Sequence, residues 1–500
     1  MSQMKHDEFQ FPFPFPFPIR RFCPAWEDES HPLLLPASPP PSPSPSSLDH
    51  PSHLYDLVDT FINLDPDTPP SHVDNSPFDD SLVLHLLPPL RVSSPAHLIE
   101  PGVDQGLLLV HSLLACAEAV GCRDTQLARS LLSQLWPSIS PTGNSLQRVS
   151  YYFAVGLNAR LLLLHNASVN GNCGMTSDMI NDAIRYPTAT IPDKMDALRL
   201  LHQTTPYISF PFLAANDAIL LAAQGKDSLH IIDLGVKHSF QWPSLLHVLG
   251  SREEGAPKCI RITGIVSLIR ETDDYLITEL KSSGQQLVDI ATSVGIASLE
   301  YDLIMEELTP SLFTKEKLKV REGEAVFVNS IMQLHRYVKE SRGYLKAILQ
   351  AMKRLEPTLM TVVEQDANHN GPFFMGRFLE SLHYYSAIFD SLEASLPRES
   401  PERAKIERFH YAEEIRNIVA NEGTERVERH ERADQWRRQL GRAGFQGVGL
   451  KGMGEATAMV SGYGCEGYTV ALEKGCLLLG WEGRPIMSAS AWQVQHSSRS

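Results

Sequence analysis

The stretch SLHIIDLGVKHSFQWPSLLHVL, residues 228–249, joins a strand-like run to a helical one. Residues 228–235 are mostly apolar, include two adjacent isoleucines and end at a glycine, which is typical of a short buried strand. The second part carries apolar residues at helical spacing, namely Trp242, Leu245, Leu246 and Leu249. A buried strand followed at once by an amphipathic helix predicts a strand-helix unit of an α/β protein.

Four more strand-like runs follow in the chain: CIRITGIV (259–266), SLEYDLI (298–304), EAVFVNSI (324–331) and TLMTVVEQ (358–365). Strands alternating with helices predict a doubly wound, mostly parallel sheet with right-handed crossovers. Residues 467–492 contain two further runs separated by Glu473, Lys474 and Gly475, which indicates a C-terminal antiparallel hairpin. Seven strands with an antiparallel terminal pair resemble the fold of S-adenosylmethionine-dependent methyltransferases, an analogy of architecture that does not decide activity.

Three regions are expected, at residues 1–100, 101–225 and 226–495. The first is an acidic arm that holds 20 of the 35 prolines and, with 4 Lys/Arg against 14 Asp/Glu, carries −10 of the net charge of −15. Proline removes backbone donors, so most of this arm is predicted to be disordered. The second is a leucine-rich helical cap region, and the third is the α/β core.

One segment of the arm, residues 53–65, has the spacing of an amphipathic helix. Its apolar stripe consists of Leu54, Leu57, Val58, Phe61 and Ile62. Two interpretations stand side by side: a transient helix without a partner, or a segment that folds in a partner's groove.

The cap region has apolar faces that are broad for its length. Leu109 and Leu113 belong to one stripe, and leucines between residues 127 and 135 form the next. Such faces suit helix packing within the chain or pairing with another chain. Leu109 and Leu113 are therefore candidate partner-binding residues.

Composition excludes several classes of protein. A pI near 5.7 without a long basic run argues against binding nucleic acid by bulk electrostatics. The seven cysteines are scattered and form no CxxC pair, which indicates a reduced, intracellular protein without a disulfide framework or structural zinc. No apolar stretch reaches the length of about 18 residues that a membrane-spanning helix needs, so no membrane association is expected.

Several motifs carry a resemblance to a known family. Residues 229–249 closely resemble the VHIID motif of the plant GRAS family, with the matching positions His230, Ile231, Ile232, Asp233, Gln241, Trp242 and Pro243. MQLHRYV (332–338) resembles the end of the family's second leucine-rich region, and residues 362–395 are similar to its PFYRE region. Residues 426–445 and 479–493 match the SAW region. The arm holds no DELLA peptide, which disfavours that branch, and Tyr411 to Ile415 depart from the PFYRE pattern of many members.

A methyltransferase site is tested against the same loop. Methyltransferases need glycines spaced two apart after the first strand, and an acid after the second strand binds the ribose. Asp233 and Gly235 fit, but Lys237 and Ser239 occupy the next two glycine positions. The second strand ends at residues 263–265 without a carboxylate. No catalytic residue and no cofactor are therefore expected.

Other sites have weaker signals. The histidines show no HxxxH or HExxH spacing for zinc.

Polar residues expected at strand ends either line a ligand site or satisfy backbone groups in tight loops; they are His230, Asp233, Asn368, His369 and Asn370. The charge run 412–440 predicts a solvated helix with i, i+4 ion pairs, with phosphate contact as the alternative, through arginines that include Arg426, Arg429, Arg432, Arg437, Arg438 and Arg442.

The resemblance implies a transcriptional regulator in the nucleus that controls plant development or signalling. Its implied partners are other GRAS proteins, in homo- or heterodimers, and DNA-binding zinc-finger transcription factors, with weak or indirect DNA association. The competing hypothesis is a small-molecule-binding receptor or a vestigial methyltransferase-like enzyme that uses a pocket at the strand ends.

Overall fold

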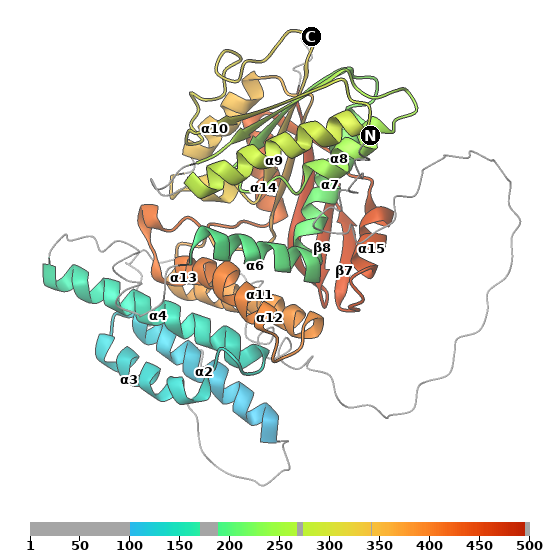
Figure 1. The fold of residues 1–500 in the computed structure, drawn as a ribbon. Coiled ribbons are helices and arrows are strands. Elements are labelled where there is room, and N and C mark those ends of the chain that lie inside the picture. Colours follow the sequence, from blue (N-terminus) through green and yellow to red (C-terminus); the bar gives the residue numbers. More distant parts are fainter. Residues whose placement is uncertain (1–100, 171–188, 268–273, 342, 496–500) are drawn as a thin grey trace, which may run out of the picture.

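The computed structural model describes residues 101–170, 189–267, 274–341 and 343–495 (Figure 1). It contains a nine-stranded sheet in the order β3-β2-β1-β4-β5-β9-β8-β7, with β6 paired to β9. The predicted arm, with Leu54, Leu57, Phe61 and Ile62, lies outside the described residues.

The five predicted parallel strands are confirmed. They are β1 (Ser228–Leu234), β2 (Cys259–Ile265), β3 (Ser298–Ile304), β4 (Ala325–Ile331) and β5 (Leu359–Gln365). The chain runs from β1 outward to β3 and then returns to β4 on the other side of β1. The strand order therefore reverses between β1 and β4, which is where ligands bind in open α/β sheets.

The C-terminal end of the sheet is larger than expected. The predicted hairpin is present as β7 (Tyr468–Glu473) and β8 (Cys476–Trp481), but β9 (Arg484–Val494) adds a third strand and joins β8 to β5. The short strand β6 (Phe445–Val448) also pairs with β9. Both hairpin turns use two residues with positive φ, Lys474-Gly475 and Glu482-Gly483, the conformation that suits tight hairpins. The prediction of seven strands is thus corrected to nine.

Helices cover both faces of the sheet, as the doubly wound prediction requires. On one side Leu229 and Ile231 of β1 share a hydrophobic core with α7 (Pro206–Ala222) and α8 (Trp242–Gly250). On the other side Ile232 and Leu234 pack with α10 (Gly343–Arg354) and α14 (Ala433–Ala443). Alternate residues of one strand thus enter two cores, which explains why its sequence is almost wholly apolar. Two further helices lie along the sheet, α9 (Asp274–Ser293) and α15 (Met453–Ser461).

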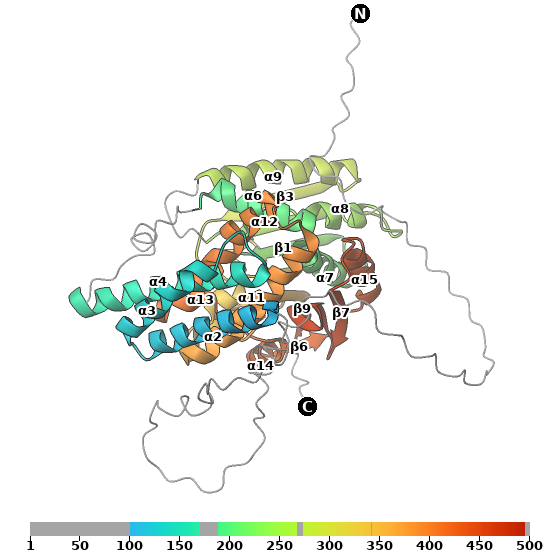
Figure 2. The ribbon, with the colours of Figure 1, turned by 90° about the horizontal axis from the view of Figure 1, so that it is seen from below.

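A layer of helices lies against one end of the α/β core (Figures 1 and 2). Its N-terminal members are α2 (Pro101–Gly121), α3 (Thr125–Leu135), η2 (Trp136–Ser138), α4 (Ser145–Asn170) and α6 (Ile191–Thr204). Its other members come from after β5: α11 (Phe374–Ser395), α12 (Pro401–Ile406), the π-helix η4 (Glu407–Tyr411) and α13 (Ala412–Ala420). Helix α4 packs against both α11 and α13. The helical layer therefore draws on both sides of the expected boundary at residue 225, while α7 packs on the sheet.

Two short 3-10 helices complete the described elements, η3 (Leu334–Tyr337) and η5 (Gly423–Glu425). Among the helices that the structure describes, none combines the length and the apolar character needed to cross a membrane.

Candidate functional site

A hydrogen-bonded network of side chains lies at the carboxyl end of β1. Asn329 of β4 donates from Nδ2 to Asp233 Oδ1 at 2.9 Å and to Gln241 Oε1 at 3.0 Å. Gln241 Nε2 donates to Asn216 Oδ1 of α7 at 3.0 Å, and Thr361 Oγ1 of β5 donates to Asn329 Oδ1 at 2.8 Å. The network ties β1, β4, β5 and α7 together at the switch point.

Asp233 is buried in this network. Burial raises the pKa of Asp233 to about 7, and hydrogen bonds from Asn329 and Trp242 only partly offset that effect. Its carboxyl group is held by neighbouring side chains, so its observed role is to orient the switch-point network.

The other residues of the VHIID-like motif have structural positions. Ile231 and Ile232 are fully buried on opposite faces of β1, and Trp242 is buried at the start of α8. Pro243 lies in the first turn of α8, where a missing N–H costs nothing. His230 lies inside β1 instead of at its end, and its Nε2 is 2.8 Å from Thr263 Oγ1. The expectation that His230 lies at a strand end is thus wrong.

The space that a nucleoside cofactor would need beside β1 is filled by protein. A Cβ placed on Gly235 would lie 2.1 Å from Gln333 Cδ, so the Gln333 side chain packs where a cofactor would approach. Gly235 has φ +69°, which also favours glycine there. After β2 comes buried Val266 and then Ser267, whose hydroxyl lies 3.2 Å from Tyr337 Oη. Gln333 beside Gly235 and the uncharged residues Val266 and Ser267 after β2 argue against an S-adenosylmethionine site here.

Lys237, which replaces a loop glycine, has an unusual environment. Its side chain reaches solvent, yet removal of surrounding water by nearby protein lowers its pKa to about 8, assisted by Arg336. The adjacent His238 ring stacks on Phe240 with ring centroids 4.6 Å apart, and burial lowers the pKa of His238 to about 3. The stacked rings of His238 and Phe240 thus crowd this loop.

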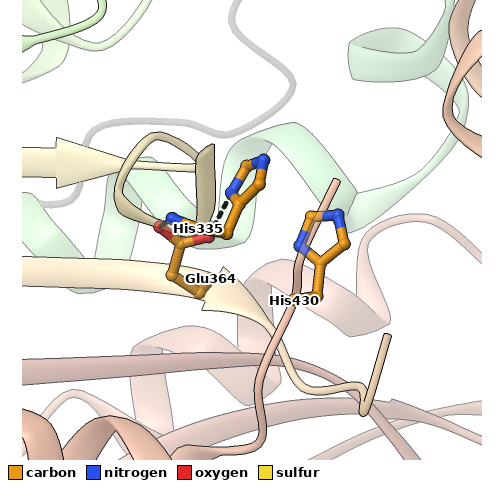
Figure 3. Close-up of side chains that lie close together, drawn as sticks. All are labelled: His335, Glu364 and His430. Carbon is orange, nitrogen blue, oxygen red and sulfur yellow. Dashed lines mark hydrogen bonds and ion pairs between the residues drawn. The ribbon is translucent and has the colours of Figure 1, made fainter. Parts of the chain in front are cut away.

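A second polar cluster lies beside the ends of β4 and β5 and combines three segments that are far apart in sequence (Figure 3). His335 of η3 has Nδ1 2.7 Å from Glu364 Oε2 of β5 and Nε2 3.0 Å from Glu428 Oε2. His430 Nε2 lies 3.2 Å from the same Glu428 oxygen. All four residues are buried. We call this set the His-Glu cluster.

The electrostatics of the His-Glu cluster favour positive charge. Burial lowers the pKa of His335, but Glu364 and Glu428 outweigh burial and raise it to about 9. Burial and the nearby His335 lower the pKa of His430. Arg336 also binds Glu428, with Nη1 3.2 Å from Oε1. One imidazole is therefore drawn toward the charged form and the other toward the neutral form.

Sequence spacing alone did not identify this cluster, because its members come from η3, β5 and the 426–432 segment. One signal was available: each member falls within a stretch that resembles a family motif, and Glu364 is the one charged residue of the buried strand β5. A charge inside a buried strand needs a partner, which identifies it as a residue with a specific role.

The loop after β5 contains the remaining strand-end residues. His369 is buried and stacks on Tyr385 at 5.8 Å, whereas Asn368 is exposed. Asn370 donates from Nδ2 to Glu431 Oε1 at 2.7 Å and accepts from Arg429 Nη1 at 3.1 Å. These contacts are mainly with side chains, so neither the ligand interpretation nor the backbone interpretation describes Asn370 fully.

The charge run 412–440 is not one solvated helix. Residues 426–432 form an irregular segment between η5 and α14, and Arg426 and Arg429 are buried. Arg426 Nη1 donates to the His369 carbonyl at 3.0 Å, and Arg429 Nη2 donates to the Gly423 carbonyl at 2.9 Å. The prediction is wrong for this segment, because protein groups, which for Arg429 also include Asn370 Oδ1, take the place of water around these two guanidinium groups. Arg432, Arg438 and Arg442 are exposed, and Arg437 pairs with Asp434 at 2.8 Å.

Leu109 and Leu113, the candidate partner-binding residues of the cap region, are buried in the main core of the chain. Their direct contact with a partner is therefore corrected to a packing role. Neighbouring apolar residues are exposed instead: Leu108 at 62%, Leu127 at 48% and Trp136 at 37%. The sequence could not separate these two sets, since both lie in leucine-rich helices.

Both polar clusters lie within a part of the chain that matches a known protein family. The model of the GRAS domain family matches residues 109–493, which include the switch-point network and the His-Glu cluster. The chain belongs to the GRAS domain family.

Individual GRAS relatives span most of the chain. The GRAS family protein RAD1 of Lotus japonicus is 44% identical over 404 residues, covering 79% of this chain and 75% of the relative. The DELLA protein RGL1 of Arabidopsis thaliana is 36% identical over 402 residues, covering 78% and 71%. The crystal structure of SCL7 from Oryza sativa has a TM-score of 0.66 at 29% identity and covers 77% of this chain and 99% of its own. The GRAS fold expected from the motifs is confirmed.

Proposed function

We propose that this GRAS protein is a transcriptional regulator that acts in the nucleus through protein-protein contacts and controls plant development or signalling. The partners are other GRAS proteins and DNA-binding zinc-finger transcription factors. The observation that carries the proposal is family membership over residues 109–493 together with a switch point filled by the chain's own side chains. Since a shared fold does not determine function, the filled site is what favours binding over catalysis.

The competing hypothesis of a receptor or vestigial methyltransferase requires space at the same edge. Gln333 packs against Gly235, and the end of β2 supplies no carboxylate for a ribose. Isothermal titration of the full chain with S-adenosylmethionine should give no heat of binding. A dissociation constant of about 10 μM or tighter, roughly 7 kcal/mol of binding, would contradict the proposal.

Charge supports an indirect route to DNA. The formal net charge is −15, and phosphate contacts need clustered Lys and Arg. A zinc-finger partner would supply base recognition, and this chain would add only weak or indirect DNA association. An electrophoretic mobility assay should therefore show a shifted DNA band with the partner and a further shift when this chain is added.

The outer face of α2, α3 and η2 is the surface we assign to a GRAS partner. Leu108, Leu127 and Trp136 are large apolar side chains exposed to solvent, while Leu109 and Leu113 pack inward. Covering exposed apolar area with a partner removes it from water, which contributes favourably to the free energy of binding. The partner surface is therefore moved from the buried leucines to their exposed neighbours on the same helices.

Paired variants test this surface. Leu108→Asp with Leu127→Asp should abolish co-purification with a GRAS partner and leave the circular dichroism spectrum unchanged. Ser112→Asp with Ser133→Asp is the matched control, since both serines are exposed on the same two helices. Leu113→Asp should instead unfold the helical layer. Partner binding that survives the Leu108/Leu127 change would remove this surface from the proposal.

Nuclear location is tested independently of binding. A fluorescent fusion of the full chain should accumulate in nuclei of plant cells, and affinity purification from those nuclei with mass spectrometry should recover transcription factors. Exclusion of the fusion from nuclei would contradict the proposed role.

A further inference from the structure

The His-Glu cluster brings three metal-ligand side chains together in the protein interior (Figure 3). His335, Glu364 and His430 each offer one ligand atom, and these atoms lie within 4.8 Å of one another. Figure 3 shows a ring nitrogen of His430 turned toward His335 and Glu364. Nitrogen and carboxylate oxygen in this combination are donors that zinc accepts.

Glu428 lies beside both histidine rings. Its Oε2 is 3.0 Å from His335 Nε2 and 3.2 Å from His430 Nε2. The contact with His335 is a hydrogen bond and favours N–H at its Nε2, which leaves a lone pair on His335 Nδ1, whereas both ring nitrogens of His430 lack a hydrogen-bond partner among the described residues. A carboxylate that fixes the tautomer of a histidine in this way is the usual outer partner of a zinc ligand.

The inner side of the cluster holds a hydrogen bond and an unused ring nitrogen. His335 Nδ1 and Glu364 Oε2 are 2.7 Å apart, the separation of an N–H···O hydrogen bond, so a metal ion would displace the proton between them and move the two atoms slightly apart. A proton on His335 serves only these two atoms. His430 Nδ1 is buried and has no hydrogen-bond partner among the described residues. A metal ion at this point would use all three ligand atoms.

We infer that His335, Glu364 and His430 bind a zinc ion, with Glu428 orienting the His335 imidazole. Calcium and magnesium are disfavoured because they prefer oxygen ligands. Glu364 Oε1 accepts the backbone N–H of His335 at 3.2 Å, so the carboxylate is already fixed in place by η3. Three protein ligands leave one coordination position for water.

The missing sequence motif has a simple explanation. The ligands come from η3, β5 and the 426–432 segment, so no helix could show HxxxH or HExxH spacing. The expectation of no structural zinc rested on motifs that are local in sequence. A bound ion would join these three segments and stabilise the conformation of residues 426–432.

Metal analysis of tag-free, full-length protein tests the site. After reconstitution with zinc and gel filtration, elemental analysis should find one zinc per chain, and a chelator should lower the melting temperature. Cobalt in place of zinc should give the visible absorption of a low-coordinate site. His430→Ala should lose zinc, and Glu428→Gln should weaken binding by about 10- to 100-fold.

Two comparisons keep the test specific. His369→Ala removes a buried histidine whose ring lies 5.5 Å from His430 but which is outside the ligand set, and it should retain zinc. His430→Asn preserves size if His430→Ala fails to fold. Absence of zinc after reconstitution, or zinc retained in a folded His430 variant through exposed thiols such as Cys122, would overturn the inference.

Discussion

Arg148 of α4 and Glu407 of η4 form a buried ion pair across 259 residues of sequence, with Nε 2.9 Å from Oε1. Neither side chain has any solvent exposure. Arg148 Nη1 also binds Glu393 of α11 at 2.6 Å and the Gly143 carbonyl at 2.8 Å. The pair therefore joins the N-terminal helices to those that follow β5.

Breaking this pair should destabilise the chain strongly. Arg148→Met leaves Glu407 buried without its main partner and should lower the free energy of unfolding by about 3–5 kcal/mol. Chemical unfolding followed by circular dichroism measures this change. Lys405→Ala, which removes an exposed pair with Asp196, should cost less than about 1 kcal/mol. Equal effects in the two variants would show that the buried pair does not hold the layers together.

Asp233 should make stability depend on pH. Its pKa is raised from 3.8 to about 7, so the folded state holds the proton more tightly than the unfolded state. The contribution of Asp233 to the free energy of unfolding is fully present below pH 4. It decreases as the pH rises through 7, by at most about 4 kcal/mol. Asp233→Asn should therefore unfold at higher denaturant concentration than wild type at pH 8 but not at pH 4. The exposed Asp227→Asn should show no such gain at pH 8.

Gly235 should tolerate no side chain while Gln333 is present. Gly235→Ala adds both a positive-φ strain and a clash with Gln333, which together should cost about 2–4 kcal/mol of unfolding free energy. Gly225→Ala shares the positive φ of +67° but meets nothing within 4 Å, so it isolates the backbone cost. Gln333→Ala in the Gly235→Ala background should recover the difference. If the free energy of unfolding is not restored in this double variant, Gln333 is not the residue that fills the space beside Gly235.

The arm should act through residues 53–65. Burying Leu54, Leu57, Phe61 and Ile62 in a partner's groove returns about 1.5–3 kcal/mol per side chain, which the free segment cannot obtain. Phe61→Ser with Ile62→Ser should lower reporter transcription in plant cells at unchanged protein level. Deletion of residues 36–47, which are rich in proline and serine, should have little effect. If the deletion is as damaging as the double substitution, the arm works by another route.

Local sequence patterns were sufficient for the repeating part of the fold. Ile231 and Ile232 predicted a strand buried on both faces, and each lies in a different core. The loop with Lys237 and Ser239 predicted a site unsuited to the cofactor, and Gln333 fills the adjacent space. The periodicity of a strand and the lack of glycines in a loop depend only on residues close in sequence. Both can therefore be recognised in the sequence without knowing which segments pack against them.

Tertiary structure alone decided which similar residues are buried and which polar residues meet. Leu108 and Leu109 are adjacent leucines, yet Leu108 is 62% exposed and Leu109 7% exposed, because only Leu109 belongs to the main hydrophobic core. Arg429 lies in a charge run typical of a solvated helix, but it is buried and donates to Asn370 in the loop after β5. His335, Glu364 and His430 meet because β5, η3 and the irregular segment 426–432 converge beside the carboxyl ends of β4 and β5. Burial and long-range polar contacts depend on segments distant in sequence, which no local pattern specifies.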